Sequence, residues 1–66
     1  MDKEKRQRFP YLWERPTDDG RERGAYARDN GDGTVTVLRM EPQGAALVER
    51  EQIILADNVR LTPARR

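Results

Sequence analysis

The alternation of apolar and polar residues is clearest in the middle of the chain. Two threonines alternate with two valines over Thr34–Val37, the period of two that a half-buried β-strand shows. The preceding segment, Asp29–Gly33, contains an Asn-Gly and an Asp-Gly step, and these residue types tolerate the positive φ of a tight turn. The pattern therefore predicts a β-hairpin over Ala25–Glu41.

The alternation fails at one point of this hairpin. Val37 and Leu38 are adjacent apolar residues, and Leu38 and Met40 fall on the face opposite the valines. Either both faces of the strand are covered there, or a β-bulge bends the strand. The first alternative makes Leu38 and Met40 the candidate self-association surface.

Aromatic and charged segments precede this hairpin. Phe9–Glu14 is the densest aromatic stretch, and Pro10 within it discourages a helix but permits the start of a strand or an edge strand. Arg15–Gly24 combines a proline, two glycines and several charges, which predicts a loop. The first eight residues, 1–8, have no apolar residue after Met1 and predict a solvated arm that folding does not require.

The segment after the hairpin has two interpretations. Glu41–Gly44 predicts a type I turn, with proline second and glycine fourth. Residues 45–52 are rich in helix formers, but a helix would gather their apolar side chains in one block rather than in a stripe. The tight turns favour a strand over Ala45–Arg50 that leads into another over Gln52–Leu55.

The end of the chain predicts a closing strand. Ala56–Asn58 predicts a short turn or a single 3₁₀ turn, and Val59–Leu61 predicts a short strand. Together with the strand order, Ile53–Thr62 resembles the closing segment of SH3-like barrels. The predicted fold is all-β: a small five-stranded SH3-like barrel or strongly bent antiparallel meander over residues 9–62. A charged, disordered arm precedes it at 1–8, and a flexible tail follows at 63–66.

Composition removes the usual supports of a small domain. The chain has 66 residues, no cysteine and no histidine, so neither a disulfide nor a structural zinc site is expected. Domains of this size often need such a support, and a partner subunit is the one that remains. We therefore expect a homo-oligomer. The apolar runs are too short to span a membrane and no secretory signal is present, so we expect a cytoplasmic protein without membrane contact.

Composition also excludes most catalytic chemistry. Without serine, cysteine or histidine, nucleophile–histidine triads are impossible, and so short a chain has little room for a cleft between paired carboxylates. Asn30–Thr34 matches part of a calcium-binding loop, but Arg28 and Arg39 fall where carboxylate ligands should be. Gly31 and Gly33 alone make no nucleotide-binding motif. We therefore expect no catalytic residue, no metal and no cofactor.

One constellation suits binding. It combines aromatic and arginine side chains: Tyr11, Trp13, Arg15, Arg21, Arg23, Tyr26 and Arg28. Such a mixture can grip single-stranded nucleic acid, because aromatic rings stack on bases and arginines neutralise phosphates, or it can line a peptide groove. Trp13 can equally belong to the core. The nearly balanced net charge of +1 favours a non-catalytic protein–protein interaction or assembly module, with nucleic-acid binding as the alternative.

Overall fold

The structure, a computed structural model, describes residues 3–64 and contains one antiparallel sheet. Its strands follow one another in the sheet in the order β4-β3-β2-β1-β5, which confirms the predicted all-β fold with five strands. The sheet is open, because β4 and β5 are its two edges. The elements are α1 Lys3–Arg8, β1 Tyr11–Thr17, β2 Gly20–Asp29, β3 Thr34–Gln43, β4 Ala46–Leu55 and β5 Arg60–Pro63.

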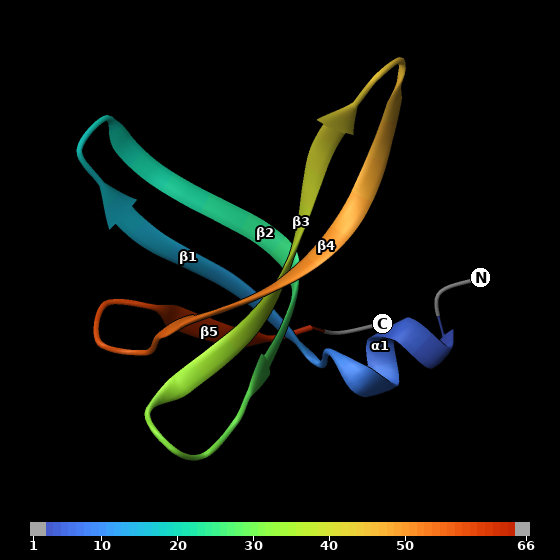
Figure 1. Ribbon diagram of the computed structural model, residues 1–66. Coiled ribbons are helices and arrows are strands. Elements are labelled where there is room, and N and C mark those ends of the chain that lie inside the picture. The colour runs from blue at the N-terminus through green and yellow to red at the C-terminus, as the bar shows by residue number, and fades with distance from the viewer. Residues whose placement is uncertain (1–2, 65–66) are drawn as a thin grey trace.

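The sheet is divided into two hairpins that diverge. Strands β2 and β3 pair over a short stretch only, from Asp29↔Val35 to Ala27↔Val37. Beyond it, the β1–β2 and β3–β4 hairpins separate like the arms of a V (Figure 1). A register shift between Tyr11 and Trp13 in the β1–β2 pairing adds to the distortion, because an extra residue on one strand bends a ladder.

The main core lies on one face of the sheet, where the strands cross. Its buried members are Trp13, Ala27, Val35, Val37 and Ile54, and the half-buried Tyr11, Ala56, Val59 and Leu61 pack against them. Trp13 is 3% exposed, so it belongs to the core rather than to an exposed binding surface. The valines of the alternating run all point into this core, as the period of two requires.

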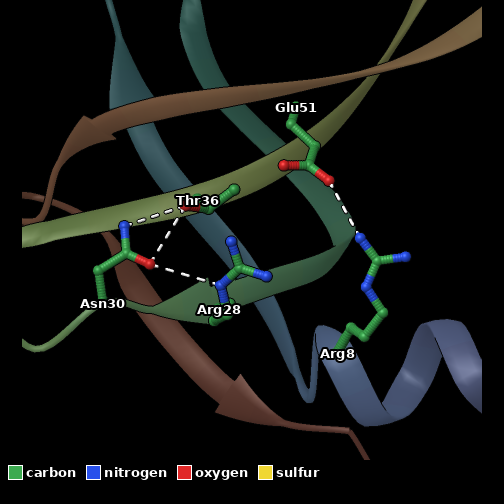
Figure 2. A network of polar contacts seen from close by, with 5 residues as sticks. All are labelled: Arg8, Arg28, Asn30, Thr36 and Glu51. Carbon is green, nitrogen blue, oxygen red and sulfur yellow. Dashed lines mark hydrogen bonds and ion pairs between the residues drawn. The ribbon is translucent and has the colours of Figure 1, made fainter.

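A second, smaller buried layer covers the opposite face. Phe9 and Thr36 are 1% and 2% exposed, and Leu38 is half-buried. The hydroxyl of Thr36 exchanges hydrogen bonds with the Asn30 amide, and Arg28 donates to the same amide oxygen (Figure 2). The β3–β4 register continues without a shift through Val37 and Leu38. The interrupted alternation therefore reflects coverage of both faces and not a bulge.

Two turns differ from the sequence-based expectation. The turn predicted over Glu41–Gly44 lies later, because β3 runs through Pro42 to Gln43 and pairs with Ala46. Gly44 has a φ of 63°, as the first central position of a type II′ hairpin turn requires. Pro42 is tolerated because this part of β3 pairs with β4 only and has no neighbour on its β2 side. The missing N–H of Pro42 therefore costs no hydrogen bond between strands.

The predicted loop Arg15–Gly24 is also wrong in large part. Strand β1 extends to Thr17, β2 begins at Gly20, and the turn between them has only two residues, Asp18 and Asp19. Opposite charges face each other across this polar hairpin, as in Glu14↔Arg23 and Arg15↔Glu22. Cross-strand charge pairs favour pairing without any apolar side chain.

The ends of the chain are more structured than expected. Instead of an irregular arm, Lys3–Arg8 forms the helix α1. Strand β5 includes Pro63, and the N–H of Ala64 donates to the carbonyl of Pro10, so the expected tail is ordered through Ala64. Residues 1–2 and 65–66 lie outside the described residues. Within residues 3–64, the structure has no helix of the length and apolar character needed to cross a membrane.

Contacts with two strands, β2 and β4, hold α1 in place. Arg6 donates hydrogen bonds of 3.0 Å to the Phe9 carbonyl and 2.8 Å to the Ala25 carbonyl. On the other side, Lys5 pairs with Glu49 at 2.5 Å, and Arg8 with Glu51 at 3.4 Å (Figure 2). A helix this short is not stable alone, so these contacts, which the local sequence does not reveal, account for its presence.

Replacing Arg6 by alanine tests this account. We expect Arg6→Ala to lower the free energy of unfolding by about 1–2 kcal/mol, because two charge-assisted hydrogen bonds to backbone carbonyls are lost. Lys3→Ala is the matched control, since Lys3 is exposed on the same helix. Urea denaturation of both variants measures the difference. Equal stability of the two variants would show that the hydrogen bonds of Arg6 do not stabilise the fold.

Candidate functional site

The aromatic–arginine constellation does not form one surface. Trp13 lies in the core, and Tyr11 packs against it half-buried. Tyr26 lies on the other face, beneath Lys5 and Arg6, whose charged groups are 4.9 and 4.3 Å from its ring centroid. These side chains therefore offer no shared stacking platform.

The arginines of the constellation are likewise dispersed. Arg28 lies over the ring of Phe9 on the second face. Arg15 pairs with Glu22 at 3.1 Å, and Arg21 is 3.5 Å from Glu14. Arg23 is exposed, and the structure of residues 3–64 shows no ion pair for Arg23 or for Arg28.

Carboxylates interleave with the basic residues over most of the described surface. Glu14 is shared by Arg21 and Arg60, and Glu22 is shared by Arg15 and Arg39. Arg50 pairs with Glu41 at 2.9 Å. A surface patterned in this way presents no broad basic face to a phosphate backbone.

The most organised polar cluster lies between the two hairpins. Glu22 of β2 accepts from Arg15 of β1 and forms an ion pair with Arg39 of β3. The guanidinium of Arg39 also lies 5.8 Å from the centre of the Trp13 ring. Partial burial raises the pKa of Glu22, but the hydrogen bonds and charges of Arg39 and Arg15 outweigh burial and lower it overall. This carboxylate therefore links the two hairpins at the point where their backbones have separated.

The lowered pKa of Glu22 predicts a pH-dependent contribution to stability. Because the folded-state pKa lies below the unfolded value, the stabilisation is present above about pH 4.5 and is lost as the pH falls through the folded-state pKa. Glu22→Gln should therefore be less stable than the wild type near about pH 7, with a gap that closes as the pH falls below the folded-state pKa of Glu22. Denaturant titrations of both proteins across this range measure the gap. A gap independent of pH would contradict the assigned ion pairs.

Two buried N–H donors lie beside this cluster. The indole Nε1 of Trp13 and the Nε of Arg39 are buried and have no acceptor within the described part of the chain. The indole lies against Gly24, where a Cβ atom would collide with its nitrogen and approach Cε2 to 3.0 Å. Glycine at this position is what lets the ring lie flat against β2.

A different kind of surface lies along β3 and β4. Ile53 and Leu55 are 66% and 68% exposed, and they stand opposite Thr36 and Thr34 on the second face. Opposite residues of an antiparallel pair point to the same side, so the two apolar side chains are neighbours on that face. Strand β4 is an edge of the sheet, and the sequence analysis did not single these two residues out.

The predicted self-association residues are separated by the structure. Leu38 is half-buried and lines a shallow pocket with Phe9 and Lys5, so the chain's own N-terminal segment covers it. Met40 is 56% exposed and lies near Leu47, which is 65% exposed. The surface available to a second molecule therefore includes Met40 and residues of β4, but little of Leu38.

The loop that resembles a calcium site is held by its own hydrogen bonds. Asp29 accepts from the N–H of Gly31, and Asp32 accepts from both the N–H and the hydroxyl of Thr34. These hydrogen bonds from Thr34 lower the pKa of Asp32. Among residues 3–64 no three metal-ligating side chains come together.

Comparisons with known proteins do not add a family to this description. No family model matches the chain, and no curated protein and no solved structure is significantly similar to it.

Proposed function

We propose that the protein is a non-catalytic assembly module that self-associates through the edge strand β4. The observation that carries the proposal is the exposed pair Ile53 and Leu55, two large apolar side chains that are each about two-thirds exposed, 66% and 68%, on a strand with a free edge. Exposed apolar side chains on an edge strand mark an interaction site.

A second copy of the chain is the occupant that fits best. A twofold axis perpendicular to the sheet near Ile54 would set Ile53 of one copy opposite Leu55 of the other, twice. The charged block Glu49–Glu51 disfavours pairing along the whole strand, because a twofold axis there would oppose like charges. Charge thus confines the proposed contact to the apolar C-terminal half of β4.

The distribution of arginines supports this proposal over nucleic-acid binding. Most described arginines have a glutamate partner, and Tyr26 is covered by α1. Counterion release from a nucleic acid needs basic groups that are free to meet phosphates. Nucleic-acid binding therefore has no favourable observation of its own.

We also propose a relation to SH3-like barrels. The strand order β4-β3-β2-β1-β5, with the last strand paired to the first, supports it, as does the turn before β5, where the N–H of Val59 donates to the Ala56 carbonyl. The open sheet differs from a closed barrel, and a relation in fold implies no particular function.

Light scattering tests the proposed self-association. We expect an oligomer, most simply a dimer, at tens of micromolar protein, roughly the range in which a small apolar contact is populated. Leu55→Glu should yield a folded monomer, because Leu55 is exposed and contributes little to the core. Gln52→Glu is the matched control, since it adds the same charge to the same strand on the opposite face, and it should remain an oligomer. A monomeric wild type would refute the proposal.

A further inference from the structure

A pocket between the diverging hairpins, here called the cleft, has unused strand edges on both sides. Pairing of β2 with β3 ends at Ala27↔Val37, yet β2 begins at Gly20 and β3 continues to Gln43. Within residues 3–64, the stretch of each strand beyond this point has a hydrogen-bonded neighbour on its outer side only (Figure 1). Such edges accept an added strand.

Side chains and backbone both border this cleft. Consecutive residues of two strands line the cleft. They are Glu22 and Arg23 of β2 and Leu38 to Met40 of β3, and Trp13 of β1 completes the lining. In a strand, consecutive side chains point to opposite faces. A pocket lined by consecutive residues is therefore bordered by the strand edge itself, not by one face of the sheet.

The cleft carries an excess of positive charge. Its lining contains two guanidinium groups, those of Arg23 and Arg39, and one carboxylate, that of Glu22. Arg23 is exposed, and no ion pair of Arg23 occurs in the described part of the chain. A ligand with carboxylates would balance this charge, and the exposed position of Arg23 leaves it free to reach such a ligand.

Two buried donors without acceptors lie beneath the cleft. The indole N–H of Trp13 and the Nε–H of Arg39 are buried and have no acceptor among residues 3–64. The guanidinium of Arg39 lies 5.8 Å from the centre of the Trp13 ring. Buried polar groups are nearly always hydrogen-bonded. Both unmatched groups are donors and both are enclosed by the chain itself, so they mark a surplus of donors beneath the cleft and not a contact with a ligand.

We propose that this cleft binds an extended, acidic segment of a partner protein, which adds as a strand along the free edge of β3. Backbone N–H and carbonyl groups of the segment pair with those of the free β3 edge, and its negative charge meets Arg23. The chain's own terminal segments, 3–8 and 60–64, are both net basic and are poor occupants. The cleft is separate from the Ile53–Leu55 contact, so the two proposals stand or fall independently.

Fluorescence of Trp13, the single tryptophan of the chain, reports binding at the base of the cleft. The probe is a synthetic peptide of about ten residues in which glutamate alternates with valine or threonine, compared with the same peptide carrying lysine in place of glutamate. The protein used is Leu55→Glu, together with the wild type. We expect a saturable fluorescence change with the acidic peptide, none with the lysine peptide, and weaker binding in about 0.5 M salt.

Charge reversal locates the site. Arg23→Glu should weaken binding of the acidic peptide at least about fivefold, because it turns an attraction into a repulsion. Lys3→Glu is the matched control on α1, outside the lining of the cleft, and should change the affinity less than about twofold. Arg23 and Lys3 are both exposed, so neither variant should unfold the protein.

Several results would overturn the proposal. They are equal binding of both peptides, no binding at about 1 mM peptide, or acidic-peptide binding that Arg23→Glu leaves unchanged. If Leu55→Glu remains an oligomer that the acidic peptide dissociates, a second copy occupies the cleft instead of an acidic partner.

Discussion

Replacing Phe9 by alanine is expected to lower the free energy of unfolding by about 3–5 kcal/mol, the usual cost of removing a buried aromatic ring. Phe9 is 1% exposed, although it precedes the first strand and belongs to no part of the main core. The guanidinium groups of Arg8 and Arg28 lie 5.4 and 5.0 Å from its ring centroid. A chain of this size has a total stability of roughly 3–10 kcal/mol, so the variant should lose a large share of it.

The control for this substitution is another apolar truncation. Leu47→Ala removes a side chain that is 65% exposed and should change stability by less than about 0.5 kcal/mol. Urea denaturation followed by circular dichroism compares the variants with the wild type. If Phe9→Ala unfolds at the same urea concentration as Leu47→Ala, the second face has no core of its own, and the coverage of Thr36 is incidental.

The second face shows where local sequence patterns stop being informative. The alternation over Thr34–Val37 correctly predicts which face of β3 is buried, because a period of two is a property of the strand itself. The interruption at Leu38 correctly indicates that something covers the other face. It does not indicate what does so, since α1 depends on ion pairs between residues more than forty positions apart, 44 for Lys5 and Glu49.

The charged β1–β2 hairpin also shows a limit of predicting strands from local sequence, because its pairing depends on residues of both strands. Residues 15–24 look like a loop because they contain no large apolar residue, but their charges alternate in sign so that opposite charges meet across the strands. Pro16 and Pro42 look like strand breakers, yet both strands tolerate them where one side has no paired neighbour. Which side of a strand is unpaired is a property of the sheet and not of the strand.

The candidate binding surfaces also depend on the arrangement of the sheet and not on the local sequence. Tyr11, Trp13 and Tyr26 attract attention in the sequence as large aromatic residues, but a small domain needs such side chains for its interior. Ile53 and Leu55 lie within an apolar run that reads as core, and only the position of β4 at the edge of the sheet exposes them. The cleft between the hairpins is likewise invisible until the length of the β2–β3 pairing is known.

Gly24→Ala is expected to destabilise the protein by about 1–3 kcal/mol, the cost of adding volume to a well-packed site. The added Cβ would overlap the indole nitrogen of Trp13, and Trp13 is enclosed by the core and by Arg39, so the ring has to tilt or β2 has to move. Either change should alter the fluorescence emission of Trp13 in the folded state, which separates this mechanism from a simple loss of strand stability.

Ala25→Val is the control. It adds more volume at the next position of the same strand, where the side chain is exposed and a β-branched residue favours a strand. It should leave both stability and emission nearly unchanged. Wild-type stability and emission in Gly24→Ala would mean that the ring does not rest on β2, and the base of the proposed cleft would then have to be placed elsewhere.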